Sequence, residues 1–152
     1  MYSAVLLAHS WIRWIALIAA VGTILAALRI RVPADRAGAD RWSLFAMAAL
    51  DLQMLLGLIL YIVLSPVTKS AFVDMAAAMR EAPIRFFAVE HPVGMIVAIA
   101  LAHVGRVRVR KASDSESKHK RALVFFGLAL LVLLLSIPWP IGPGARSLFR
   151  GL

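Results

Sequence analysis

The chain has 152 residues, of which 62% are hydrophobic, carries a net charge of +9 and contains no cysteine. The lack of cysteine excludes disulfides, thiolate metal sites, iron–sulfur clusters and haem attached through a C-x-x-C-H motif. Soluble domains are nearer half apolar, and the basic residues here lie beside the apolar runs. This arrangement is typical of membrane loops that face anionic lipid and argues against a nucleic-acid partner.

Four apolar runs each reach the roughly 20 residues that a helix needs to cross a bilayer. In chain order they predict helices over about 3–28, 42–64, 86–105 and 122–141. Runs this long and continuous favour helices, whose backbone bonds are satisfied within each segment. Between the second and third runs, apolar residues at helical spacing predict a short amphipathic surface helix over about 71–80. We therefore expect an all-α, integral membrane four-helix bundle forming a single transmembrane domain over residues 1–152.

The Lys and Arg residues of the connections predict the orientation of the bundle. The second connection has basic residues balanced in part by acidic ones, whereas the first and third are strongly basic. The basic residues of those two connections are Arg29, Arg31, Arg36, Arg41, Arg106, Arg108, Arg110, Lys111, Lys118, Lys120 and Arg121. We expect both connections in the cytoplasm and both termini on the outer, periplasmic side of a bacterial inner membrane.

Ionisable groups are few inside the predicted helices, and each is a candidate site because placing it in a bilayer is costly. His9 and His91 lie roughly 9 Å and 8 Å from the outer ends of the first and third helices. Two imidazoles facing each other at one depth can hold a haem iron from both sides. For either histidine alone, a hydrogen bond to a backbone carbonyl or a lipid headgroup is the alternative. The fourth helix carries no charge, and we assign it no chemistry.

A haem also needs space beside its ligands. Gly94, Ala98 and Ala102 follow His91 at steps of three and four residues, so they share a helix face. This stripe of small residues could admit a flat porphyrin, with plain helix packing as the alternative. Pro92 either disturbs the turn around His91 or marks the first turn of a helix that starts later.

Two arginines are candidate partners for haem propionates. Arg13 lies one turn from His9 on the same helix face and would pair with a propionate or with one of the acids Glu90 and Asp51. Arg85 lies at the outer rim of the third helix, where propionates would emerge. Both arginines are therefore predicted to belong to the haem site.

A second candidate polar site lies toward the cytoplasmic side. Asp51 and His103 fall in the inner halves of the second and third helices. His103 is about 120° around its helix from His91, so it points elsewhere, and snorkelling toward the interface is the alternative for it. A proton path through this pair is a weaker hypothesis than the haem site.

Several segments resemble a family of small four-helix bacterial membrane proteins labelled cytochrome b-like. They are HSWIRW, DLQMLLGLILY, RFFAVEHPVGMIVAIALAHVGR and GLALLVLLLSIPWP. The resemblance covers nearly the whole chain and implies a b-type haem, with His9, His91 and His103 at matching histidine positions. Many relatives have a histidine where this chain has Asp51, which implies that an inner haem would lack one ligand here while the outer pair is intact.

These observations favour a membrane b-type cytochrome-like protein that holds one haem b through His9 and His91. Bis-histidine ligation leaves no open iron position, which favours single-electron transfer over oxygen chemistry. We expect an electron carrier, or a subunit of a quinone-linked or reaction-centre-type complex, and no stand-alone enzyme. The alternatives are a haem-free structural accessory subunit of a respiratory or photosynthetic complex, and a small proton or solute carrier that uses Asp51, Arg13 and His103.

Overall fold

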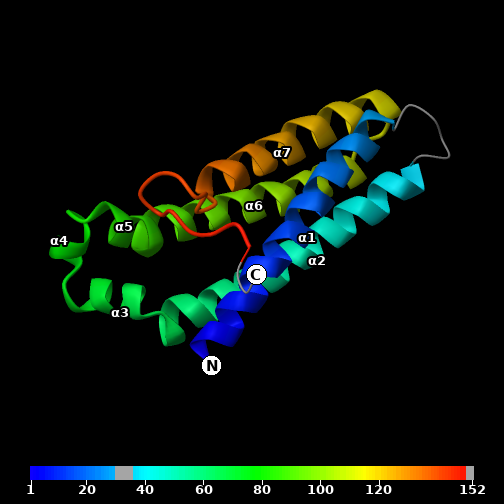
Figure 1. Cartoon of the computed structure of the whole chain (residues 1–152). Helices are drawn as coiled ribbons and strands as arrows, with labels where there is room; N and C mark the ends of the chain where they lie inside the picture. The colour runs from blue at the N-terminus through cyan, green and yellow to red at the C-terminus, as the bar shows by residue number, and fades with distance from the viewer. Residues whose placement is uncertain (30–35, 150–152) are drawn as a thin grey trace.

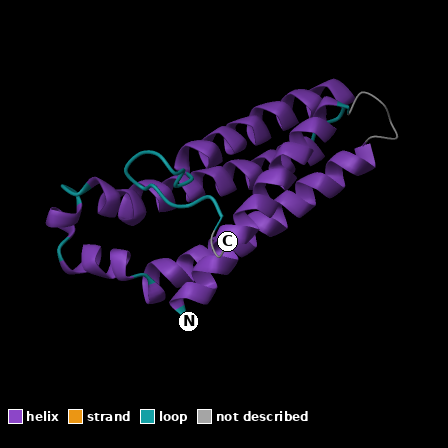
Figure 2. Cartoon of the chain, viewed as in Figure 1, coloured by secondary structure: helices purple, strands orange, loops and turns teal. Residues whose placement is uncertain are grey.

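The computed structural model describes residues 1–29 and 36–149, with side chains from residue 41 onward after the gap. Within these ranges the chain is all-α, and Figure 2 shows helices joined by loops. The elements are α1 (Tyr2–Leu28), α2 (Arg36–Leu58), the π-helix η2 (Ile59–Leu64), α3 (Pro66–Val73), α4 (Met75–Ala78), α5 (Ala82–Arg85), the π-helix η3 (Phe86–Glu90), α6 (His91–Arg110) and α7 (Ser115–Ser136). Of the first connection, Arg31 and the side chain of Arg36 lie outside the described residues.

Among the described residues, four segments are long and apolar enough to cross a membrane. They are Tyr2–Leu28, Arg41–Leu64, Ala82–Arg110 and Ser115–Ser136. The last one begins and ends earlier than the sequence predicts. It begins at Ser115 because the Asp114 carboxylate accepts a hydrogen bond from the Ser117 N–H and caps the helix. It ends at Ser136 because Ile137, which precedes a proline, is extended.

The surface segment predicted over 71–80 is broken at Asp74. Ser65 caps α3, and Pro66 occupies its first turn, so this helix starts earlier than expected. Asp74 has a non-helical backbone, and its carboxylate accepts a hydrogen bond from the Ala77 N–H at 2.9 Å. Asp74 therefore ends one short helix and starts the next.

The four long helices pack as a ring in which α1 lies against α2 and α7, and α6 lies against α7 and α2 (Figure 1). Their shared core is built mostly from alanines, which let helix backbones approach closely in a bilayer. The buried residues of this core are Ala16, Ala20, Ala27, Ala49, Leu50, Ala98, Ala102, Ala122, Phe126, Ala129 and Leu133. We call the part of the bundle from Ala16 to Ala27 of α1, with the helix segments facing it, the packed half.

The other part of the bundle is more open. Around the first turns of α1 the helices separate, and the short helices α3 to α5 connect α2 to α6 across the gap (Figure 1). The segment after α7 runs back over this end of the bundle, as the red trace in Figure 1 shows. We call this part, which contains His9 and His91, the cavity half.

Candidate functional site

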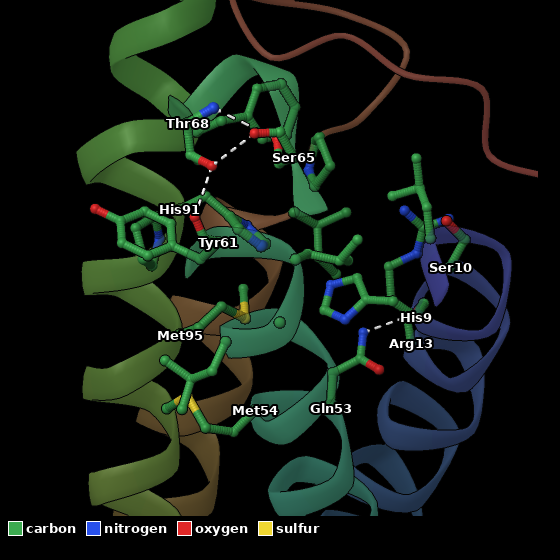
Figure 3. Close-up of a pocket in the computed structure, with 18 of the residues that line it drawn as sticks. His9, Ser10, Arg13, Gln53, Met54, Tyr61, Ser65, Thr68, His91 and Met95 are labelled. Atoms are coloured by element: carbon green, nitrogen blue, oxygen red, sulfur yellow. Dashed lines mark hydrogen bonds between the residues drawn. The ribbon is translucent and has the colours of Figure 1, made fainter. Parts of the chain in front are cut away.

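A cavity of about 490 Å³ occupies the cavity half. It is lined by α1, α2, η2, α6 and the segment after α7, and Figure 3 shows His9, Gln53 and His91 around it. Its volume is within the range of pockets that hold small molecules and cofactors. The cavity therefore has room for a ligand beside the two histidines that the sequence singles out.

His9 and His91 face one another across this space. Their ring centroids lie 6.3 Å apart, and their planes are inclined by 79°. A metal ion lies about 2 Å from an imidazole nitrogen, so two rings on opposite sides of one ion have centres roughly 6 Å apart. The separation of His9 and His91 thus fits a single ion held between them.

His91 is oriented by a backbone group of α7. Its Nδ1 lies 2.7 Å from the carbonyl oxygen of Ser136, so Nδ1–H donates to that oxygen. Histidines that bind a metal usually donate their second ring nitrogen in this way, which leaves Nε2 free as a ligand. The sequence-based assignment of no chemistry to the fourth helix is therefore incomplete. Its contribution is a main-chain carbonyl, which no residue type could have signalled.

His9 is held in place by α2. Gln53 donates from Nε2 to the His9 carbonyl oxygen at 2.8 Å. One turn further, Gly57 lets the ring lie close, because a Cβ there would come within 3.3 Å of His9 Cε1. His9 Nδ1 and Gln53 Oε1 are buried and lack hydrogen-bond partners among the described residues. Gln53 is not among the site residues predicted from the sequence, although its spacing of four from Gly57 is visible there.

Arg13 also lines the cavity, but it pairs with neither predicted acid. Its Nη2 donates to the Leu148 carbonyl oxygen at 2.6 Å, and its guanidinium lies 5.2 Å from the Trp14 ring centre. The predicted acidic partners are bonded elsewhere, Glu90 to Arg85 and Asp51 to His103. Arg13 is only 9% exposed, and its Nε has no partner among the described residues. It is a buried cation with a spare donor.

Two residues predicted for the haem site lie outside the cavity. Arg85 is exposed, and its Nε donates to the Glu90 carboxylate at 2.7 Å. Gly94 faces α7, since a Cβ there would overlap the Ser136 hydroxyl. Ala98 and Ala102 belong to the alanine core. The small-residue stripe therefore serves helix packing, because it is the α7-facing side of α6.

The proline after His91 lies inside a continuous helical span, and the helix does not start later. Pro92 has no N–H, so the carbonyl of Ala88, four residues earlier, has no α-helical donor at that position. The Tyr61 hydroxyl donates to the Ala88 oxygen at 2.7 Å. Tyr61 lies in η2 and Ala88 in η3, so this bond joins the two π-helices beside the cavity. Short π-helical segments are frequent near functional sites.

Asp51 and His103 meet away from this cavity. His103 Nε2 lies 2.8 Å from Asp51 Oδ1, and the side chains are 43% and 53% exposed, respectively. A second polar contact joins the same helices, where Arg106 donates to the Ser43 hydroxyl. The pair is thus separate in space from His9, Arg13 and His91, which line the cavity, and it lies on the outer surface of α2 and α6.

The donor set limits which metal sites are open to the chain. Within residues 1–29 and 41–149 no cluster of three or more His, Cys, Asp or Glu could hold a metal ion. A centre that needs four protein ligands is therefore not formed by these residues, whereas a haem iron needs only two axial ones. Comparisons with protein-family models, curated proteins and solved structures found no match for the chain.

Proposed function

We propose that this chain is a multi-pass membrane protein that holds one haem b between His9 and His91 and transfers single electrons. The observation that carries the proposal is the facing pair of imidazoles, 6.3 Å apart across a cavity of about 490 Å³. Two axial histidines leave no position for oxygen, so the bound haem would supply one-electron redox chemistry.

The residues around the cavity have distinct tasks in this proposal. Ser136 fixes the orientation of the His91 ring through its carbonyl oxygen. Gln53 and Gly57 hold His9 against α2. Arg13 lines the cavity with a buried positive charge, which favours an anionic group such as a propionate in its neighbourhood and would favour the reduced state of a bound haem.

The charge distribution supports our proposal for the orientation of the chain, and the resemblance to bacterial membrane proteins supports our proposal for the membrane. We place the chain in a bacterial inner membrane with the cavity half toward the periplasm, because the connections at the other end are rich in Lys and Arg. In this placement the site lies near the outer surface, where other membrane subunits of an electron-transfer complex or a quinone would exchange electrons with it.

The test is a visible absorption spectrum of the full chain purified in detergent from haem-replete cells. We expect a sharp reduced α-band that disappears in His9→Ala and in His91→Ala. His103→Ala and His119→Ala are matched controls, because they remove histidines outside the cavity, and both should keep the band.

A colourless wild-type protein with native helicity would overturn the haem proposal. It would favour the haem-free accessory role, for which the large apolar surface of the long helices is the supporting observation. A band that survives loss of His91 but not of His103 would place the haem at the other end of the bundle.

A further inference from the structure

The outward faces of the four long helices differ in one respect. On α1, and on α7 after its charged first turns, the large exposed side chains are apolar, as at Ile18 and Leu128. On α2 and α6 the exposed surface contains the hydrogen-bonded pair of Asp51 and His103. In the proposed membrane placement, and among the residues that the structure describes, only this face would present ionisable side chains to the bilayer away from the helix ends.

The depth of the pair makes its exposure costly. Asp51 lies ten residues, or roughly 15 Å, after Arg41, and His103 lies three residues, or roughly 5 Å, before Arg106, so the pair lies in the cytoplasmic half of the hydrocarbon layer. Ionisable groups at such depth face a bundle interior or a partner in most membrane proteins. Because the pair is about half exposed in the isolated chain, its outer side needs a covering that lipid tails do not provide.

The surface of α2 and α6 around Asp51 and His103 has the pattern of a surface that packs against two further helices. Exposed residues on α2 recur at alternating steps of four and three, and those on α6 do the same, which is the spacing of a helix-packing seam. These residues are Leu44, Ala48, Asp51, Leu55 and Leu58 on α2, and Val93, Val97, Ala100, Val104 and Val107 on α6. Each seam has a small residue one turn from the pair, Ala48 or Ala100, where another helix can approach closely.

The hydrogen-bonding groups of Asp51 and His103 indicate what covers this face. Asp51 accepts a hydrogen bond from His103 Nε2 and keeps its second carboxylate oxygen as an acceptor, while Nδ1 of His103 is a donor when the imidazole is protonated. A two-fold rotation brings the acceptor of one copy to the donor of the other, so the face is complementary to itself. We propose that α2 and α6 form an intramembrane interface between two copies of this chain, with Asp51 of one copy meeting His103 of the other. This inference rests on the proposed membrane placement and not on the haem.

The chain has no cysteine, so introduced thiols can be cross-linked without background. Two chains with tags of different length are co-expressed, one with Ala48→Cys and the other with Ala100→Cys, and native membranes are treated with a short bifunctional thiol reagent. We expect a cross-linked band with the summed mass of the two tagged chains. Leu128→Cys on α7 in both chains is the matched control and should give no such band.

A second variant tests the role of the polar pair. Asp51→Leu with His103→Leu in both chains should lower the cross-linked fraction roughly five-fold, as expected for the loss of buried polar contacts in a bilayer. Asp51→Asn keeps hydrogen-bonding capacity and should retain most of it. Circular dichroism and gel filtration in detergent check that each variant is folded.

The proposal is overturned if the Ala48 and Ala100 thiols give no dimer in membranes, give only a conjugate with another protein, or dimerise equally well with both leucines. The absorption spectrum is read on the same samples. A colourless protein that cross-links would reject the haem and keep the interface, whereas a pigmented monomer would do the reverse.

Discussion

The two halves of the bundle use similar apolar helices to opposite effect. In the packed half, alanines such as Ala27, Ala102 and Ala122 are at most 3% exposed and bring four helices together. In the cavity half, the same helices separate around about 490 Å³ of space that contains polar side chains. On α1 the buried alanines of the core extend from Ala27 toward the N-terminus as far as Ala16. On the N-terminal side of Ala16, bulkier and polar residues line the interior.

Specific hydrogen bonds surround the cavity, so it is a defined feature of the fold. Two π-helices, η2 and η3, lie at the ends of the separated helices, and the Tyr61–Ala88 hydrogen bond joins them. The segment after α7 closes this end through the Leu148 carbonyl, which accepts from Arg13 and from Trp14 Nε1. These bonds link the segments that surround His9 and His91 at the open end of the bundle, whereas small side chains let the helices approach closely elsewhere.

The largest expected effect tests whether the contact between α6 and α7 beside His91 is as tight as the contacts in the packed half. A Cβ in Gly94→Ala would overlap the Ser136 hydroxyl and lie 2.8 Å from Ser136 Cβ, so rotation of the hydroxyl does not suffice and α6 and α7 must separate. We expect a loss of about 3 kcal/mol in the free energy of unfolding, measured by denaturant titration of helicity in detergent. Gly127→Ala is the control, because nothing lies within 4 Å of its Cβ, and an equal loss in both variants would contradict the packing difference.

A second comparison removes a large side chain from each half. Phe126→Ala leaves a void in the packed half, where Phe126 is 4% exposed. We expect it to lower the free energy of unfolding by about 2 kcal/mol, mainly through lost packing contacts. Met54→Ala should cost clearly less, because Met54 already borders the cavity. Equal losses in the same titration would show that the cavity is closed in the folded protein.

A third prediction concerns the bond that joins the π-helices. Tyr61→Phe removes the donor to the Ala88 carbonyl and should cost about 1 kcal/mol, measured as above. In a Pro92→Ala background the backbone N–H of residue 92 can serve that carbonyl, so the same change should cost less. Additive effects of the two substitutions would mean that Pro92 does not create the need for Tyr61.

The smallest effect concerns the capped start of α7. The pKa of Asp114 is lowered from 3.8 to about 2, chiefly by the hydrogen bond from the Ser117 N–H. Its contribution to stability is therefore present above about pH 4 and is lost as the pH falls toward 2. Asp114→Asn keeps a capping oxygen and should remove this part of the pH dependence, seen in acid titrations of thermal unfolding. An unchanged profile would show that the cap is not formed.

Single residues show which features of the site could be predicted from the sequence and which could not. The matched depth of His9 and His91 was predictable, because helical rise and the ends of apolar runs fix depth along a membrane normal. The direction of Gly94 was not, since its stripe could face either a ligand or α7. For Arg85, depth at the rim could be predicted from the sequence, but its bond to Glu90 could not.

The sequence alone determined the number of long helices, the distribution of charge and the pairing in depth of the two histidines, because length, hydropathy and residue type report on position along each helix. Only the tertiary structure decided what each side chain meets around the helix axis. The Ser136 carbonyl beside His91, the Leu148 carbonyl beside Arg13 and the open side of the Asp51–His103 pair depend on how helices approach one another. The first two of these features are backbone carbonyls, which every residue has, so no residue type marks them in advance.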